Sequence, residues 1–304
     1  MKYYQRQMAI IFALITPLLL SSCSKDIDSN HTTIESETIS INTLDELTTL
    51  FTKLDYTSTN WNKAERNIPR ISIDGISKSW STDSAKLPVQ TKKTIFFRLM
   101  TPLSLIANEN ILRERQTVTS ASLDNNELLI IAVKYRVIKD LKTPLTESLR
   151  KQLLNRVDIV PVSLALAQSA EESGWGTSRF AAEGNAFFGQ WDFSGKGMKP
   201  KQQREALGNY GVARFDSPLE SVEAYMLNIN TNAAYTKLRS LRVKMHSDDN
   251  QITGYQLTTT LDKYSERGEA YVQGLQHLIR YNKLETTDSV KLSDDKWIHL
   301  KILN

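Results

Sequence analysis

The stretch Pro161-Val-Ser-Leu-Ala-Leu-Ala-Gln-Ser-Ala-Glu-Glu-Ser-Gly-Trp-Gly176 decides the fold that we predict for this chain. Most of its residues before the acidic pair are small or apolar, which is the composition of a tightly packed central helix. Pro161 suits the first turn of such a helix, where a missing N–H costs nothing. Gly174 and Gly176 are expected to end it. We therefore predict a buried helix that closes on Glu171 and Glu172.

Glu172 is the candidate catalytic residue of this stretch. A spacing of four residues places Leu164, Gln168 and Glu172 along one line of the helix. A carboxylate at the end of a packed helix, beside Trp175, is poorly solvated, and desolvation raises a carboxyl pKa. A general acid for glycosidic cleavage needs that property near neutral pH. Acidic residues are also common at solvated helix ends, and the spacing alone favours this simpler interpretation.

The segment from 183 to 214 is rich in glycine and aromatic residues, and residues 210–215 alternate like a strand. This pattern predicts a small β-hairpin lobe inserted between helices. Flat aromatic rings often line glycan clefts, where they stack on sugars. The candidates are Trp175, Phe187, Phe188, Trp191, Tyr264 and Tyr271. Core packing explains most buried aromatic residues, and we favour it for Phe187.

Helical patterns dominate the rest of the body. The expected helices span residues 45–54, 89–115, 126–137, 144–154, 217–230, 235–245, 254–261 and 267–281. Pro102 is expected to kink or split the second of them, and Ser217 with Glu220 forms a capping box at the start of the fifth. Ile71 and Ile73 alternate as in a short strand. The predicted fold class is mainly α, with a helical lobe and a small β-hairpin lobe; the tail that contains Trp297 is left unassigned.

The first 22 residues have the composition of a signal peptide, with Lys2 and Arg6 before an apolar stretch at residues 8–20. That stretch is short for a membrane-spanning helix, which needs about 20 apolar residues. Leu20-Ser-Ser-Cys23 resembles the bacterial lipobox, so we expect a lipid anchor on Cys23 and a flexible polar tether at residues 23–42. A plain signal peptide with a chance cysteine is the alternative. The expected location is the cell envelope, as a lipoprotein at the outer membrane facing the periplasm.

Charge and composition exclude several other function classes. Of the 38 basic residues, Lys2 and Arg6 leave with the signal segment, and the remaining 36 face 34 acidic residues. This balance is too even for a nucleic-acid partner. Cys23 is the single cysteine, so no internal disulfide forms. No metal or other cofactor is expected, because no metal-ligand spacing relates the four histidines, His31, His246, His277 and His299. We expect a monomer.

Four separate elements resemble the motifs of the endo-β-N-acetylglucosaminidase family of bacterial wall hydrolases, which includes the hydrolase domain of the flagellar rod-assembly protein FlgJ. They are residues 167–176, the loop Gly184-Asn-Ala-Phe-Phe-Gly189, the element Phe215-Asp-Ser-Pro-Leu-Glu-Ser221, and the pair Tyr264 and Tyr271. Asp216 departs from the family pattern, because an aromatic residue is usual near that position. The upstream segment at residues 92–115 resembles the Bax branch of the family, whose members carry a helical extension.

The resemblance implies a lysozyme-like α+β fold and five regions along the chain. They are a signal peptide at 1–22, a tether at 23–42, a Bax-like helical extension at 43–149, a glucosaminidase domain at 150–285 and a C-terminal tail at 286–304.

The resemblance also implies the reaction, which is cleavage of the N-acetylglucosaminyl β-1,4 bond in peptidoglycan glycan strands with Glu172 as general acid. Glu205 is our choice for the second carboxylate, and Glu183 is the fallback. Tyr264 would orient the substrate's acetamido group or the attacking species. The expected substrate-binding residues are Trp175, Asn185, Phe188, Trp191 and Tyr271.

Several alternatives stay open at this point. Two distant carboxylates would favour an intervening water and inversion of configuration, whereas assistance by the substrate's acetamido group needs no second carboxylate. A muramidase or a lytic transglycosylase would use the same fold. Host N-glycans are a further substrate class. A different class of protein is a non-catalytic lipoprotein that binds glycan or a partner.

Overall fold

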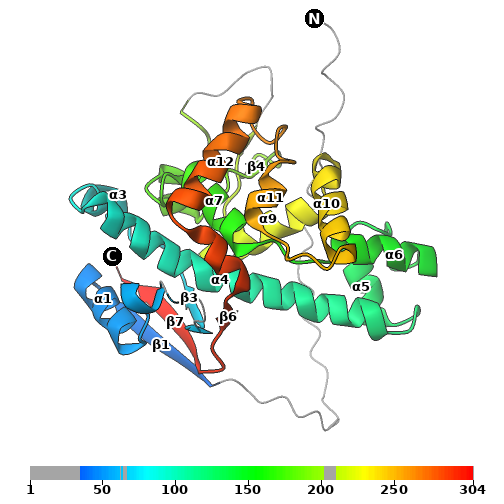
Figure 1. Cartoon of the computed structure of the whole chain (residues 1–304), viewed down its shortest axis with the longest axis horizontal. Helices are drawn as coiled ribbons and strands as arrows, with labels where there is room; N and C mark the ends of the chain where they lie inside the picture. The colour runs from blue at the N-terminus through cyan, green and yellow to red at the C-terminus, as the bar shows by residue number, and fades with distance from the viewer. Residues whose placement is uncertain (1–34, 62, 64–66, 202–209, 304) are drawn as a thin grey trace, which may run out of the picture.

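A long helix, α4 (Val89–Ser120), runs across the molecule and separates its two layers (Figure 1). On one side lie α7 (Val162–Ser173), α9 (Pro218–Thr231) and α12 (Glu269–Tyr281). On the other side lies a small parallel sheet. The computed structural model describes residues 35–61, 63, 67–201 and 210–303. The mainly helical α+β architecture is the one predicted from the sequence.

Helix α7 is the packed central helix that the sequence predicts. Its residues from Val162 to Ala170 are all buried, and it packs against α4, α11 (Gly254–Thr258) and α12. Asp288 caps its first turn, because its carboxylate accepts hydrogen bonds from the backbone N–H and hydroxyl of Ser163 at 2.8 and 2.7 Å. Burial raises the pKa of Asp288 to about 6. Gly174 ends the helix in the left-handed conformation, with φ +57°.

From the sequence, we expect Pro102 to kink or split helix α4. The helix is continuous over 32 residues, so the split does not occur. Pro102 is itself buried, within a helix that packs against both β3 and the helices of the opposite layer. The hydroxyl groups of Thr101 and Ser104 donate to backbone carbonyls one turn earlier. Most residues from Ile95 to Asn108 are buried, and we attribute the tolerance of the proline, which costs about 3 kcal/mol in a helix interior, to this packing.

The remaining predicted helices form within a few residues of their expected bounds. They are α1 (Leu44–Lys53), α5 (Asn126–Lys134), α6 (Glu147–Arg156) and α10 (Thr236–Ser247). Shorter helical turns are α2 (Ser58–Trp61), α3 (Trp80–Ser84), α8 (Arg179–Gly184), η2 (Ala233–Tyr235) and η3 (Leu284–Ser289). The predicted cap of α9 is confirmed, because the Ser217 hydroxyl accepts from the Glu220 N–H at 3.2 Å.

A parallel sheet unites the two ends of the described chain. Its strand order is β1 (Ser36–Ile41), β7 (Trp297–Ile302) and β3 (Ile71–Ile73). A second parallel pair joins β2 (Asn67–Ile68) to β6 (Lys291–Leu292). The predicted tether at residues 23–42 therefore extends too far, because residues 36–41 pair with β7 along its whole length. The tail that the sequence leaves unassigned forms β7, whose Ile298 and Leu300 are buried in the core.

The predicted hairpin lobe is present in the described residues. Strand β4 (Trp191–Asp192) pairs antiparallel with β5 (Gly211–Val212). Met198 extends the pairing through two backbone hydrogen bonds with Val212, at 2.7 and 2.9 Å. Ala186, Met198 and Val212 form a small core of their own. Glu205, the expected second carboxylate, lies outside the described residues.

The structure leaves the expected membrane anchor untested. The signal segment at residues 1–22 and Cys23 both lie outside the described residues. Within the part of the chain that the structure describes, no helix is long and apolar enough to cross a bilayer.

The junction of α7 and α11 gives the first testable prediction. A methyl group on Gly254 would overlap the Ser163 hydroxyl and lie 2.5 Å from the Leu164 nitrogen. We expect Gly254→Ala to lower the free energy of unfolding by about 2–3 kcal/mol, because neither neighbour has room to move. Gly274, within α12, has nothing within 4 Å of the same position. Gly274→Ala is therefore expected to add about 0.5–1 kcal/mol, and urea titrations of both variants measure the contrast. Equal losses would contradict this account.

Candidate active site

Glu172 lies in the last turn of α7, where its carboxylate is reached by solvent on one side and contacts protein atoms on the other. The residue keeps an exposed surface. On the inner side, however, its Oε1 accepts a hydrogen bond from Tyr271 at 2.9 Å, and a Cβ at Gly189 would lie 3.7 Å from its Oε2. The residue is exposed and yet partly enclosed, because its carboxylate is open to solvent in one direction and surrounded by protein atoms in the others. This partial burial raises the pKa of Glu172 above its ordinary value.

A chain of three hydrogen bonds ends on Glu172. Tyr225 donates to the Oε1 of Gln168 at 2.6 Å, and Gln168 donates through Nε2 to the Tyr271 hydroxyl at 3.1 Å. Tyr271 then donates to Glu172. Gln168 is fully buried, and both ends of its amide are used, so the direction of the chain is set. Oε1 of Glu172 is therefore an acceptor, and Oε2 is the oxygen that carries the proton of the neutral acid.

Stacked aromatic rings surround this hydrogen-bond chain. Tyr264 stacks on Tyr271 with ring centroids 5.3 Å apart and planes at 6°. Phe188 stacks on Tyr225 at 4.0 Å and 7°. Burial raises the pKa of Tyr225, Tyr264 and Tyr271 well above the ordinary tyrosine value, and that of Tyr235 to about 12. These hydroxyl groups consequently stay neutral donors at physiological pH.

Two charged neighbours act on Glu172 in opposite directions. Glu171 and Arg267 form an ion pair at 2.6 Å, and the Arg267 guanidinium lies 5.1 Å from the centre of the Tyr271 ring. Burial is the largest influence on the Glu172 pKa and raises it, while the Tyr271 hydrogen bond lowers it. The charge of Glu171 raises this pKa further, and the charge of Arg267 lowers it.

Two of the expected substrate-binding side chains are buried, and their roles need correction. Phe188 is 2% exposed and packs on Tyr225, so its ring does not face a substrate. Tyr271 is 1% exposed and holds Glu172 instead. Asn185 is half-buried, and its amide donates to the carbonyl of Phe215 at 3.2 Å. This hydrogen bond fixes the loop that contains Asn185, whose own backbone is left-handed, with φ +50°.

The remaining predicted residues take varied positions. Trp175 is half-buried and meets Phe97 edge-on at 5.2 Å. Trp191, on the hairpin lobe, is 41% exposed and fits the expected open aromatic surface. Tyr264 donates to the Phe188 carbonyl at 3.4 Å and braces Tyr271, so its hydroxyl contacts the loop before Gly189. Phe187 is buried, as predicted.

The fallback carboxylate, Glu183, is paired with Arg179 at 2.9 Å on the exposed side of α8. Sequence reasoning missed Tyr225 and Arg267, since neither belongs to a recognisable local pattern. Gln168 carried a usable signal, because its spacing of four from Glu172 on a buried helix places a polar side chain where it needs partners. Among the described residues, no group of three or more His, Cys, Asp or Glu side chains is placed to hold a metal ion.

Comparisons with known proteins point to one family. Residues 148–284 match the Glucosaminidase family model, described as mannosyl-glycoprotein endo-beta-N-acetylglucosaminidase. Over 201 residues the chain is 33% identical to "Protein bax" of Escherichia coli (strain K12), which covers 62% of this chain and 69% of that protein. No solved structure matches the chain.

Proposed function

Since this chain belongs to the Bax-type branch of the endo-β-N-acetylglucosaminidase family, we propose that it hydrolyses the β-1,4 bond on the reducing side of N-acetylglucosamine in peptidoglycan. The observation that carries this proposal is the state of Glu172. Its carboxyl group is open to solvent on one side, has a raised pKa and accepts a hydrogen bond from Tyr271 on Oε1. A raised pKa favours the protonated form of the acid, and a proton on Oε2 can pass to a departing sugar oxygen.

Gly189 gives the substrate room in front of this proton. Its φ of +61° lies in the left-handed region, which a glycine adopts at no steric cost. A side chain at this position would stand 3.7 Å from Oε2, in the space that the glycosidic oxygen must enter. The Tyr225–Gln168–Tyr271 chain holds the opposite side of the carboxyl, so the acid needs no reorientation as the bond breaks.

The second half of the reaction supplies the attacking group. We propose Glu205 as the base that activates water, which would invert the anomeric configuration. Attack by the substrate's own acetamido group would retain that configuration instead. Proton nuclear magnetic resonance of the first-formed anomer distinguishes the two routes. An inverted product supports a second carboxylate, and a retained product moves the role from Glu205 to the substrate.

Mass spectrometry of products from purified sacculi tests the proposed bond directly. Reducing-end N-acetylglucosamine is the expected product. Reducing-end N-acetylmuramic acid would indicate a muramidase, and anhydro-muramyl ends would indicate a lytic transglycosylase. Release of N-glycans from glycoproteins, with intact sacculi, would move the substrate to the class in the family description. Binding without any product would indicate a non-catalytic glycan-binding protein.

The charges beside Glu172 predict two opposite shifts of the pH profile. Because Glu172 acts as an acid, activity is lost as pH rises through its pKa. Arg267→Gln removes a charge that lowers this pKa, so the alkaline limb should move to higher pH. Glu171→Gln removes a charge that raises the pKa, so the limb should move to lower pH. Profiles of kcat/KM against pH measure both, and shifts of the same sign would contradict the assignment.

We also propose that Cys23 carries a lipid anchor and places the protein at the outer membrane. Labelled palmitate fed to expressing cells should enter the wild-type chain and not the Cys23→Ser variant. Absence of label from both would favour a plain secreted protein, and equal labelling of both would place the acyl group at a residue other than Cys23.

A further inference from the structure

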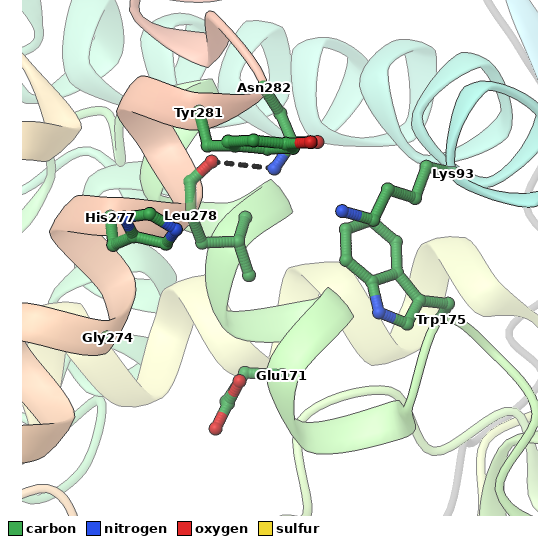
Figure 2. A pocket seen from close by; sticks show the side chains of 8 residues that line it. All are labelled: Lys93, Glu171, Trp175, Gly274, His277, Leu278, Tyr281 and Asn282. Carbon is green, nitrogen blue, oxygen red and sulfur yellow. Dashed lines mark hydrogen bonds between the residues drawn. The ribbon is translucent and has the colours of Figure 1, made fainter. Parts of the chain in front are cut away.

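A pocket of about 360 Å³ lies beside Glu171, where α4, α7 and α12 meet (Figure 2). Its walls include Lys93 from α4, Glu171 from the last turn of α7, Trp175 from the loop after α7, and Gly274 and Tyr281 from α12. Lys93 belongs to the helical extension, outside the residues 148–284 that match the family model. The extension and the glucosaminidase domain therefore build this pocket together.

Lys93 is the unusual side chain of the pocket. Figure 2 shows its ammonium group directed into the space between Trp175 and Tyr281, and it lies 4.8 Å and 5.0 Å from the centres of their rings. Two such contacts hold the cation in place. Among the described residues, no carboxylate lies within ion-pair distance of it. Glu171, the carboxylate in the wall, is already paired with Arg267 at 2.6 Å. The pocket thus presents an ammonium group with no carboxylate counter-ion among the described residues.

The pocket and the catalytic acid share two helices. Glu171 and Glu172 are adjacent on α7. On α12, Tyr271 holds Glu172, while Gly274 and Tyr281 line the pocket three and ten residues later. Since an α-helix rises 1.5 Å per residue, Tyr281 lies about 15 Å along α12 from Tyr271, the residue that contacts the acid. Tyr281 is 66% exposed, and a Cβ at Gly274 would meet nothing within 4 Å. A chain-like substrate held at Glu172 can therefore extend into the pocket.

We infer, on the basis of the proposed function, that this pocket binds a carboxylate on a muramyl residue of the substrate. Peptidoglycan strands alternate N-acetylglucosamine, which is uncharged, with muramyl residues, whose lactyl group bears either a free carboxylate or a peptide that ends in carboxylates. An ammonium group lacking a counter-ion attracts such an anion. The exposed ring of Tyr281 offers an apolar face to the adjoining sugar or peptide. The pocket would thereby distinguish bacterial wall strands from uncharged N-acetylglucosamine polymers.

Titration of the full chain with three soluble ligands tests this inference independently of catalysis. The ligands are the disaccharide of N-acetylglucosamine, the N-acetylglucosaminyl-muramic acid disaccharide with its free lactyl carboxylate, and the same disaccharide with a tripeptide. All titrations use the Glu172→Gln background, so that no ligand is cleaved. We expect Lys93→Gln to weaken binding of one or both carboxylate ligands about fivefold, as for a partly exposed ion pair, and to leave the neutral disaccharide unchanged.

Two further variants serve as controls. Lys92→Gln removes the neighbouring charge, which does not line the pocket, and should change no affinity. Lys93→Arg keeps the cation and should restore binding. A loss confined to the peptide ligand assigns the pocket to peptide carboxylates, and a loss with both acidic ligands assigns it to the lactyl group. Equal weakening for all three ligands, no weakening, or no binding by the parent chain would overturn the inference. Binding that follows the expected pattern, with no cleavage of sacculi by wild type, would instead reject the proposed function alone.

Discussion

Replacing Glu172 with Gln is expected to lower peptidoglycan hydrolysis by about 10³-fold or more, while the fold is unchanged. A glutamine keeps the shape of the side chain, and its carbonyl oxygen still accepts the Tyr271 hydrogen bond. It has no acidic proton to give to the leaving sugar oxygen, and loss of general acid catalysis costs about 10²–10⁴-fold. The loss should be nearer the upper end, because an alkoxide of a sugar is a poor leaving group without protonation.

The matched control is Glu171→Gln, one residue earlier in the same helical turn. Glu171 points to Arg267 and not to Tyr271, so its loss should shift the pH profile and preserve the maximal rate within a few fold. Reducing ends released from sacculi measure both variants, and circular dichroism checks their folding. Undiminished turnover by Glu172→Gln would remove the assignment of the acid, and a larger loss for Glu171→Gln would transfer it.

Local sequence patterns predicted those helices that are buried in the same way from one end to the other. Helix α7 is an example, because its small apolar residues leave no solvated face, and Gly174 provides a left-handed end. The sheet was not predicted, since β1 and β7 lie about 260 residues apart in sequence and no local pattern pairs two strands over that distance. The break expected at Pro102 has a related explanation. The cost of a proline is local and visible in the sequence, whereas the packing that offsets it comes from both layers around α4.

The same contrast, between local sequence patterns and contacts that only the fold creates, applies to the candidate site. The choice of Glu172 as the candidate acid follows from its motif, and its raised pKa follows from its place at the end of a buried helix. The roles of Phe188 and Tyr271 were mistaken because an aromatic residue in a motif serves equally well as a sugar platform or as a core ring. Only the fold shows that Phe188 stacks on Tyr225, and that Tyr271 turns its hydroxyl toward Glu172.

The largest stability effect is expected at a buried cation behind the active-site helix. Arg242 on α10 is fully buried, and its Nε lies 3.2 Å from a carboxylate oxygen of Asp158. Its other nitrogens donate to the Oδ1 of Asn230 and to backbone carbonyls in the segment 155–159. Burial lowers the pKa of Arg242 to about 10, so the group stays charged at neutral pH. This segment leads directly into α7, and Arg242 therefore anchors the helix that carries Glu172.

We expect Arg242→Leu to lower the free energy of unfolding by about 3–5 kcal/mol, measured by urea titration. Removal of the cation leaves Asp158 buried without its arginine partner, although the His246 ring still lies 2.8 Å away. It also leaves several backbone carbonyls without donors, and such unpaired buried groups are costly. Lys244→Leu, on the exposed side of the same helix, is the control and should change stability by less than about 0.5 kcal/mol. If Asp158→Asn is added to Arg242→Leu, the two losses should be far from additive, since the first already removes the pair. A loss below about 1 kcal/mol for Arg242→Leu would show that water replaces the guanidinium, and that the segment 155–159 does not depend on it.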